Sequence, residues 1–273
     1  MQKFSTSPLE MFAGLWRYRG LVGTMAQRDI VGRYRGSMLG LAWSFFNPVF
    51  MLAIYTFVFS GVFNARWGLG PQETKADFAI VLFVGIIVHG LFAECVNRAP
   101  GLILSNASYV KKVVFPLEVL PWVALGSAVF HAFASVLVLV VAEIVLRGHV
   151  PWTAILFPFV LLPLLFTTMG FAWFLTALGV YVRDIGQLTS VFTTVLMFLS
   201  PVFYPASALP PSVQAWLRLN PLTVIIEEGR NALVFGRVPD GYSLLLAFLV
   251  SLVVAWAGFA WFQKARTGFA DVV

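Results

Sequence analysis

Side chains that could carry out chemistry are few, and none has the spacing of a known catalytic or metal site. The sequence contains no G-x-x-x-x-G-K-[ST] phosphate loop, so we expect no Walker-type ATP site on this chain. Neither H-E-x-x-H nor G-x-S-x-G occurs. His89, His131 and His149 lack zinc-ligand spacing, and the single Cys95 excludes an internal disulfide and a thiolate-only metal cluster. We therefore expect no catalytic residue, no metal and no cofactor on this chain.

The ionisable residues of the apolar segments argue against a proton-coupled carrier. Such a carrier usually holds acidic side chains deep in its membrane spans. Here Glu94, Glu143 and Arg183 lie near segment ends, and His131 lies nearest to a segment centre. The central positions of the apolar segments thus contain almost no proton-carrying side chain.

These polar residues are better explained by packing. We expect His131 to make a helix-packing hydrogen bond, to Ser127 or Ser135 four residues away, rather than to relay protons. Glu94 and Glu118 are expected to make contacts at the cytoplasmic rim.

Composition dictates the elements that must position these side chains. The chain of 273 residues is 60 % hydrophobic and 11 % charged, and its mean hydropathy is +0.88. Soluble domains carry about 25 % charged residues, so lipid must be the main solvent. Long continuous apolar stretches favour an all-α bundle over the alternating strands of a barrel. Six segments meet or approach the roughly 20 residues that a membrane-spanning helix needs: 39–63, 78–95, 113–146, 152–181, 185–203 and 242–262.

Loop charges predict the orientation, because basic residues concentrate on the cytoplasmic side. If both ends are cytoplasmic, twelve basic residues lie inside and six outside, which accounts for all 18. The net charge of +6 is explained in the same way, without nucleic acid as a partner. We expect a single domain, residues 1–273, that crosses the membrane six times with both termini cytoplasmic.

Residues 8–35 precede the first span and are predicted to form an amphipathic helix in the headgroup layer. Glu10, Arg17, Thr24 and Arg28 recur at spacings of seven, seven and four, which places them on one helical face. The glycines at positions 20 and 23 weaken this helix and are candidate bend points.

Residues 206–235, between the fifth and sixth spans, are predicted to form a re-entrant outer hairpin. Prolines at 205, 210 and 211 break any continuous helix, and two short helices fit the remainder. Such a segment is tolerated only where protein or a water cavity surrounds it. Glu227, Glu228 and Arg230 are expected to be surface or intrahelical partners.

The aromatic residues have two readings. The chain has 27 Phe, 9 Trp and 7 Tyr, and many crowd the first span. Lipid-facing bulk and interfacial belts explain most of them. A minority could line a transport path, where flat rings pack on sugar rings, and the candidates are Trp43, Phe46, Tyr55 and Phe59.

The basic residues around the first two spans also have two readings. Arg28, Arg33 and Arg35 precede the first span, and Lys111 and Lys112 follow the second. They fit the positive-inside signal alone, or a site for a phosphorylated lipid headgroup at the inner interface.

Five motifs resemble one known family in the family's own order. The chain is similar to the membrane subunits of type-2 ABC exporters for polysaccharides, above all lipid-linked O-antigen permeases, with teichoic-acid and capsule permeases as relatives. The motifs cover nearly the whole chain and are R-D-I-V-G-R-Y-R-G-S-M-L-G-L-A-W-S-F-F-N-P at 28–48, Y-V-K-K-V-V-F-P-L-E-V-L-P at 109–121, V-R-D-I-G-Q at 182–187, F-L-S-P-V-F-Y-P at 198–205 and L-N-P-L-T at 219–223.

The resemblance implies a transport subunit rather than an enzyme. In this family two copies pair to form a channel in the cytoplasmic membrane, and a separate cytoplasmic ATPase, also in two copies, binds ATP and magnesium. The ATPase docks on a short coupling helix between spans two and three, here residues 97–110. Candidate coupling residues are Asn97, Arg98, Tyr109 and Lys111.

The resemblance also assigns the two non-spanning segments. Residues 8–35 correspond to a gate helix that borders the cytoplasmic entrance. The candidates for this entrance or for the lipid headgroup are Arg28, Arg33, Arg35 and Lys112. Residues 206–235 correspond to re-entrant helices that narrow the outer mouth, with Tyr204, Pro205, Glu227 and Arg230 as outer-gate candidates. The cargo would be a lipid-linked polysaccharide.

Two other readings remain open on the residues. The same architecture could export teichoic acid, capsule or another lipid or drug cargo, although drug-type relatives often carry large outer domains that this chain lacks. A membrane transferase would need an acid–base pair, for which Asp29 and Asp184 are candidates. Their neighbours Arg28 and Arg183 make ion pairing the simpler account.

Overall fold

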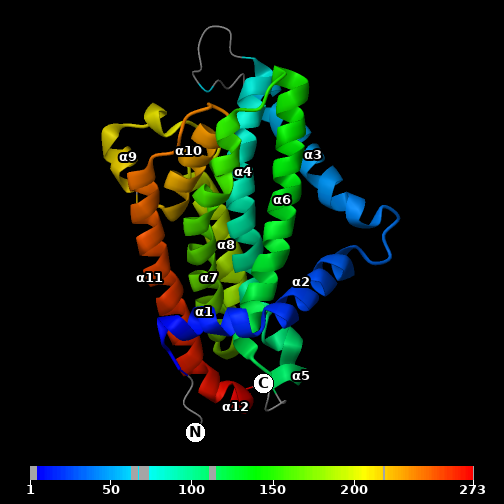
Figure 1. Ribbon diagram of the computed structural model, residues 1–273, viewed down its shortest axis with the longest axis vertical. Coiled ribbons are helices and arrows are strands. Elements are labelled where there is room, and N and C mark those ends of the chain that lie inside the picture. Colours follow the sequence, from blue (N-terminus) through cyan, green and yellow to red (C-terminus); the bar gives the residue numbers. More distant parts are fainter. Residues whose placement is uncertain (1–4, 63–66, 68–73, 111–114, 218, 273) are drawn as a thin grey trace.

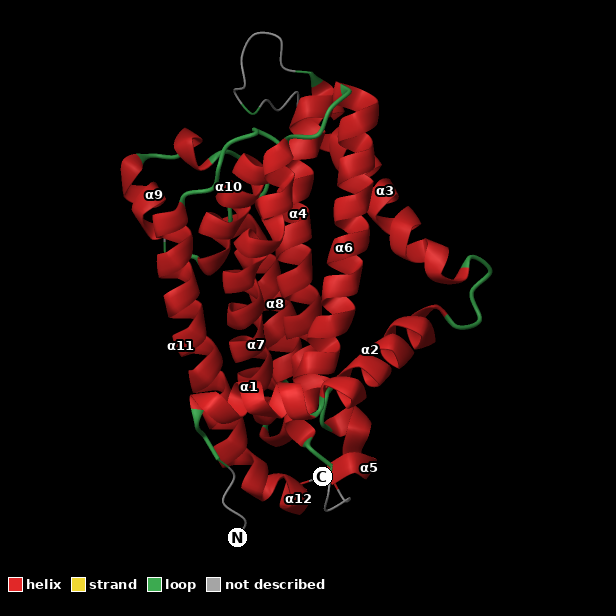
Figure 2. Ribbon diagram, in the orientation of Figure 1, coloured by secondary structure: helices red, strands yellow, loops and turns green. Residues whose placement is uncertain are grey.

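A computed structural model describes residues 5–62, 67, 74–110, 115–217 and 219–272. Helices make up most of this part of the chain, and it contains no strand (Figure 2). The predicted all-helical class is therefore confirmed. The α-helices are α1 Pro8–Arg17, α2 Arg19–Tyr34, α3 Trp43–Tyr55, α4 Lys75–Arg98, α5 Ala107–Val110, α6 Leu120–Arg147, α7 Phe157–Tyr181, α8 Ile185–Leu199, α9 Pro211–Leu217, α10 Pro221–Leu233, α11 Gly241–Ala265 and α12 Phe269–Val272.

Within the described residues, five helical segments are long and apolar enough to cross a membrane: Gly40–Phe59, Lys75–Gly101, Leu117–Arg147, Trp152–Tyr181 and Gly241–Gly268. The fifth predicted span, 185–203, corresponds to α8, an apolar helix of 15 residues. At 1.5 Å per residue α8 is about 22 Å long, shorter than a hydrocarbon core of about 30 Å. The fourth span coincides with its predicted range.

The core of the bundle is built by α4, α6, α7 and α11. In its most apolar stretch, α4 is 78 % buried. The helix α7 packs most extensively against α11, and α4 against α6 (Figure 1). The α7–α11 contact depends on glycine, since a Cβ on Gly258 would lie 2.1 Å from the Gly170 carbonyl oxygen. Small residues at such crossings let membrane helices approach closely, and dispersion contacts then hold them together.

The helix α3 is peripheral. Only 6 % of the apolar stretch at 40–59 is buried, and α3 contacts mainly α6. Together α2 and α3 form a V whose vertex points away from the bundle (Figure 1). A π-helical segment, Thr56–Val62, continues α3. The elements at the two ends of the chain, α1 and α12, lie at the same end of the bundle (Figure 1).

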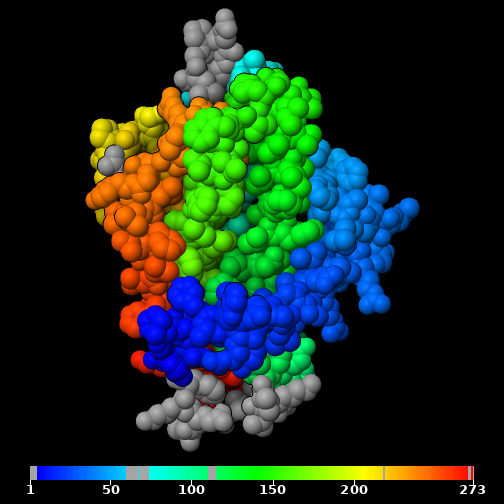
Figure 3. Space-filling view, in the orientation of Figure 1, coloured from blue at the N-terminus to red at the C-terminus, as the bar shows by residue number. Residues whose placement is uncertain are grey.

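The segment at 8–35 is two helices rather than the one predicted. The chain breaks at Tyr18, whose φ of −104° and ψ of 14° leave the α region, and not at the two glycines, which lie inside α2. The Trp256 indole donates to the Thr6 carbonyl at 3.0 Å and so ties the start of α1 to α11, whereas α2 packs on α6. The two helices form one continuous band across the lower part of the molecule (Figure 3).

The predicted helix at 97–110 also differs in the structure. Asn97 and Arg98 belong to the last turn of α4, and three short helical pieces follow: Ala99–Gly101, Leu104–Asn106 and α5. Pro100 has no N–H to continue the hydrogen-bond ladder of α4, which accounts for the break.

Between α8 and α11, the chain forms a short 3₁₀ turn, Ala206–Ala208, followed by α9 and α10. The Asn220 side chain caps α10 by accepting from the Leu222 N–H at 2.9 Å. The apolar face of α10 is buried against α4 and α7. The two short helices predicted for this segment are thus present.

Candidate functional site

Two neighbouring cavities lie where α2 meets the bundle, and Arg33 lines both. The first, here named the α2–α3 cavity, has a volume of about 360 Å³ and lies between α2, α3, α4 and α6. The second, named the α2–α5 cavity, has a volume of about 730 Å³ and lies between α2, the 102–109 segment and the start of α6. Both volumes are in the range of small-molecule sites.

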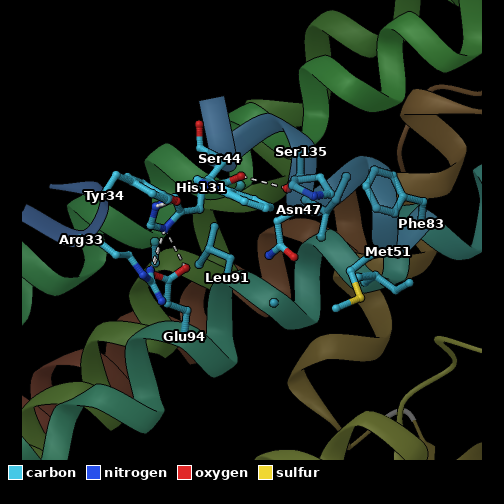
Figure 4. A pocket seen from close by; sticks show the side chains of 17 residues that line it. Arg33, Tyr34, Ser44, Asn47, Met51, Phe83, Leu91, Glu94, His131 and Ser135 are labelled. Atoms are coloured by element: carbon cyan, nitrogen blue, oxygen red, sulfur yellow. Dashed lines mark hydrogen bonds and ion pairs between the residues drawn. The ribbon is translucent and has the colours of Figure 1, made fainter. Parts of the chain in front are cut away.

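A cluster of polar side chains forms one end of the α2–α3 cavity (Figure 4). Arg33 of α2 pairs with Glu94 of α4, and His131 Nδ1 lies 2.8 Å from Glu94 Oε1. Since a carboxylate only accepts, His131 Nδ1 donates to Glu94, and His131 Nε2 shares a hydrogen bond with the Tyr34 hydroxyl at 3.0 Å. Four side chains from α2, α4 and α6 are thereby joined.

The helix-packing role predicted for His131 is confirmed, but the predicted partners are wrong. Ser135 donates to the His131 backbone carbonyl at 2.9 Å, as serine commonly does within a helix. Ser127 donates instead to Asp29. The imidazole bonds across the interface to other helices, which spacing along one helix could not indicate.

The α2–α5 cavity brings together residues from two predicted groups. Arg28 and Arg33, predicted for a headgroup site, share its lining with Arg98 and Tyr109, predicted for ATPase coupling. The Tyr109 ring stacks on Phe115 with centroids 4.3 Å apart. The two predicted groups therefore converge on one cavity.

A second link attaches α2 to the bundle at this cavity. Arg98 Nη2 lies 2.7 Å from Asp29 Oδ1, and the Ser127 hydroxyl donates to Asp29 Oδ2 at 2.6 Å. Burial opposes ionisation of Asp29, but the bonds from Arg98 and Ser127 outweigh it and lower the pKa of Asp29 below its usual value. Ion pairing of Asp29 is thus confirmed, with Arg98 as its partner rather than the adjacent Arg28.

Arg28 is a cation of this cavity that no described residue compensates. Its side chain is exposed, and it has no hydrogen bond or ion pair to the residues that the structure describes. Arg35 caps the C-terminal end of α2 and is exposed outside both cavities. Asn97 accepts from the Thr193 hydroxyl of α8 at 3.0 Å, which ties α4 to α8. The predictions for Lys111 and Lys112 lie outside the described residues.

The predicted aromatic residues divide into two groups. Trp43 and Phe46 are 40 % and 45 % exposed, and their ring centroids lie 6.5 Å apart. Trp43 also lines the α2–α3 cavity. Tyr55 and Phe59 belong to a tighter cluster in which Phe59 stacks on Phe203 at 4.9 Å. Of these four residues, only Trp43 lines one of the two cavities described above.

Arg230 was expected at the surface or in an intrahelical pair, and that expectation is wrong. Its side chain is buried and donates to the carbonyls of Val81 and Val202, each at 3.0 Å. Its guanidinium also lies 4.2 Å from the centroid of the Trp67 ring. Burial lowers the pKa of Arg230 to about 9, so the group stays charged at neutral pH.

The other outer-gate candidates are half-buried. The Tyr204 hydroxyl donates to the Phe198 carbonyl at 2.9 Å, and burial raises the pKa of Tyr204. Pro205 precedes the 3₁₀ turn at 206–208, and Glu227 lies on α10 one turn before Arg230.

The fold and the cavities define a helical, multi-span membrane protein with polar sites where its N-terminal helices meet the bundle. The sequence profile of the ABC-2 type transporter family matches residues 20–234, and the chain belongs to this family.

Three relatives match almost end to end. The chain is 29 % identical to the O-antigen export system permease protein RfbA of Myxococcus xanthus, over 95 % of this chain and 97 % of the relative. It is 24 % identical to RfbA of Klebsiella pneumoniae, over 93 % and 95 %. It is 22 % identical to the polysialic acid transport protein KpsM of Escherichia coli, over 86 % and 90 %.

Proposed function

We propose that this chain is the membrane subunit of an ATP-driven exporter that moves a lipid-linked, O-antigen-like polysaccharide across the inner membrane. The observation that carries this proposal is the match to O-antigen export permeases over nearly the full length of both chains. Capsule polysaccharide is the second candidate cargo, since the relatives include a polysialic acid transport protein. Teichoic acid or another lipid or drug cargo would use the same architecture.

The transport path requires a partner for the exposed α3. A second copy of the chain would cover part of this helix and enclose a channel with it. Trp43, Phe46, Tyr55 and Phe59 are candidates for its wall, and the exposure of Trp43 and Phe46 supports this for the first two. Asn47 adds support, because a polar side chain on an exposed membrane helix favours a wet or protein-covered surface over lipid.

Six crossings place both termini on the cytoplasmic side, with α8 as the fifth. Because α8 is short, it would reach across only where the outer hairpin covers its end. Asn220, which begins α10, donates to the carbonyl of Leu199 at 3.2 Å and to the Ser200 hydroxyl at 2.8 Å. These bonds support α9 and α10 as re-entrant elements that lie against the outer end of α8. Tyr204, Pro205, Glu227 and Arg230 would then form the outer gate.

Energy would come from a separate ATPase, present in two copies, that binds ATP and magnesium. Its docking surface would be the short helical pieces at 99–110, with Tyr109 and the neighbouring Lys111 in contact with it. Asn97 and Arg98 would act indirectly, since both bond within the chain, to α8 and α2 respectively. Movement of the docking segment would thereby reach α2, the gate element.

The lipid headgroup of the cargo would bind at the α2–α5 cavity. Arg28 supports this, because an exposed guanidinium that bonds to no described residue can give charge-assisted hydrogen bonds to phosphate. Arg33, Arg35 and Lys112 would add positive potential around it.

Complementation tests the proposal. A strain of Klebsiella pneumoniae that lacks its O-antigen permease RfbA would receive this chain together with the strain's own ATPase subunit or with the ATPase native to this chain. Surface O-antigen, detected with antibody on intact cells, should return with at least one ATPase and should depend on ATP binding by it. Polymer that stays inside the cells with both ATPases would refute the assignment of cargo.

A further inference from the structure

The polar end of the α2–α3 cavity is chemically unusual for a membrane protein. Arg33, Tyr34, Glu94 and His131 meet there at the level where α2 joins the bundle (Figure 4). Placing such groups against apolar helices is costly, and intramembrane polar residues usually serve a function. The opposite end of the cavity is apolar, with Met51 and Phe83 among its lining residues.

Asn47 faces this cavity with its hydrogen-bonding capacity unused. It lies on α3 and lines the cavity, and its side-chain amide has no partner among the described residues. An amide offers two donors and an acceptor. Ser135 and Tyr34 add hydroxyl groups on the other walls, so the cavity presents donors and acceptors from three helices.

The charge balance of the two cavities differs. In the α2–α3 cavity Arg33 is compensated by Glu94, with which it pairs. In the α2–α5 cavity Asp29 compensates Arg98, which leaves Arg28 as an excess positive charge. A phosphate therefore favours the α2–α5 cavity, whereas neutral groups that both donate and accept hydrogen bonds favour the α2–α3 cavity.

We propose that the α2–α3 cavity binds one sugar unit of the cargo, next to a phosphate held at the α2–α5 cavity. This inference rests on the proposed function and adds the chemical class of the ligand that the α2–α3 cavity binds. Sugar hydroxyls both donate and accept, which suits Asn47, Glu94 and Ser135 together, and Trp43 offers a ring face at the rim. Arg33 lines both cavities and sets the spacing between sugar and phosphate.

A lipid chain fits the same cavity less well. An acyl or prenyl chain would displace water from Asn47 and the His131 cluster without replacing their hydrogen bonds, which costs free energy for each buried polar group. The apolar wall at Met51 and Phe83 suits the carbon-rich face of a sugar ring as well.

Gly90 offers a clean way to fill the cavity. It lines the α2–α3 cavity, and a Cβ added to it would meet no atom within 4 Å. Leucine and alanine are both better helix formers than glycine, so neither substitution should disturb α4. Gly90→Leu inserts a full side chain into the cavity, and Gly90→Ala at the same position inserts one methyl group.

The experiment measures the dissociation constants of two kinds of probe for the full-length chain in lipid nanodiscs. One probe is farnesyl diphosphate, and the others are farnesyl diphosphates that carry a single glucose, galactose, mannose or N-acetylglucosamine. For the wild type, at least one sugar should tighten binding roughly tenfold over the sugar-free probe, as expected for two or three net hydrogen bonds. In Gly90→Leu the sugar-bearing probe should bind no more tightly than the sugar-free probe, whose own dissociation constant should stay unchanged. Gly90→Ala should keep both the tenfold difference and the affinity for the sugar-free probe.

A second pair of variants, at Asn47, tests the sugar site independently of Gly90. Asn47→Leu should lower the sugar ratio, and Asn47→Gln, which keeps the amide, should restore part of it. A wild-type ratio of one for every sugar overturns the inference, and so does a ratio that survives Gly90→Leu. If the wild type restores O-antigen export while the ratio is one, the sugar site alone is refuted; failure of export refutes the proposed function separately.

Discussion

Arg230 fastens α10 to α4 and to the segment at Val202, and its replacement by methionine should measure how strongly these elements are held together. Methionine is unbranched like arginine but has no charge and no N–H donor. In Arg230→Met the Val202 carbonyl, which is buried, loses the bond from Nη2, and the Trp67 ring loses its cation. The Val81 carbonyl lies inside α4 and keeps its hydrogen bond within the helix, so the loss of the bond from Arg230 Nε costs less there.

The magnitude follows from these contacts. A buried acceptor left without a partner costs about 1–3 kcal/mol. A desolvated cation–π contact is worth about 2 kcal/mol. Relief from holding a buried cation, whose pKa burial lowers to about 9, offsets part of this sum. We expect Arg230→Met to lower the free energy of unfolding by about 3 kcal/mol, or the melting temperature by about 6–12 °C.

The assay is thermal unfolding in detergent, followed by tryptophan emission. Arg237→Met is the matched control, because Arg237 is exposed and lies seven residues further along the chain. Its effect should stay within about 0.5 kcal/mol. Equal melting temperatures for the two variants would refute the fastening role and would mean that relief of the buried charge balances the lost contacts.

Three further predictions address α2, the bundle and the topology. Asp29→Asn should lower the free energy of unfolding at pH 7 by about 1–2 kcal/mol, because it removes a partly exposed charged hydrogen bond. The pKa of Asp29 in the folded protein lies below its unfolded value of about 3.9. The wild type should therefore lose this contribution to the free energy of unfolding as the pH falls below about 4. Measured over the same pH range, the free energy of unfolding of the variant should fall less steeply. Gly258→Ala should destabilise the α7–α11 contact by about 1–3 kcal/mol in the melting assay, whereas Gly186→Ala, where a Cβ meets nothing within 4 Å, should be neutral; equal effects would contradict the close packing. A membrane-impermeant maleimide should label Ser207→Cys on intact cells and Thr267→Cys only after permeabilisation, over the background of one buried native cysteine, and the reverse pattern would invert the proposed topology.

The sequence was most informative where one long apolar run decides the structure. The span at 152–181 has its predicted limits, because a proline precedes it and a charged turn follows it. The short helices at 206–235 were also accessible, since prolines at 210, 211 and 221 fix where helices can begin.

Contacts between distant residues were not accessible in the same way. Asp29 and Arg98 are 69 positions apart, and the packing of α2 on α6, which lies beside α4, brings them together. The break at Tyr18 has no strong local signal, because it follows from α1 lying on α11 while α2 lies on α6. Arg230 looked like a surface residue because its partners are backbone carbonyls, which sequence patterns do not reveal.

The most direct test of the account is reconstitution of the purified chain with its ATPase subunit in proteoliposomes. Labelled lipid-linked polysaccharide would be supplied on the side where ATP is added, and polymer protected inside the vesicles would be measured. We predict that protected polymer accumulates only when both subunits, ATP and magnesium are present, and that vesicles with this chain alone neither hydrolyse ATP nor accumulate polymer. Equal accumulation without the ATPase, or ATP hydrolysis by this chain alone, would contradict the account.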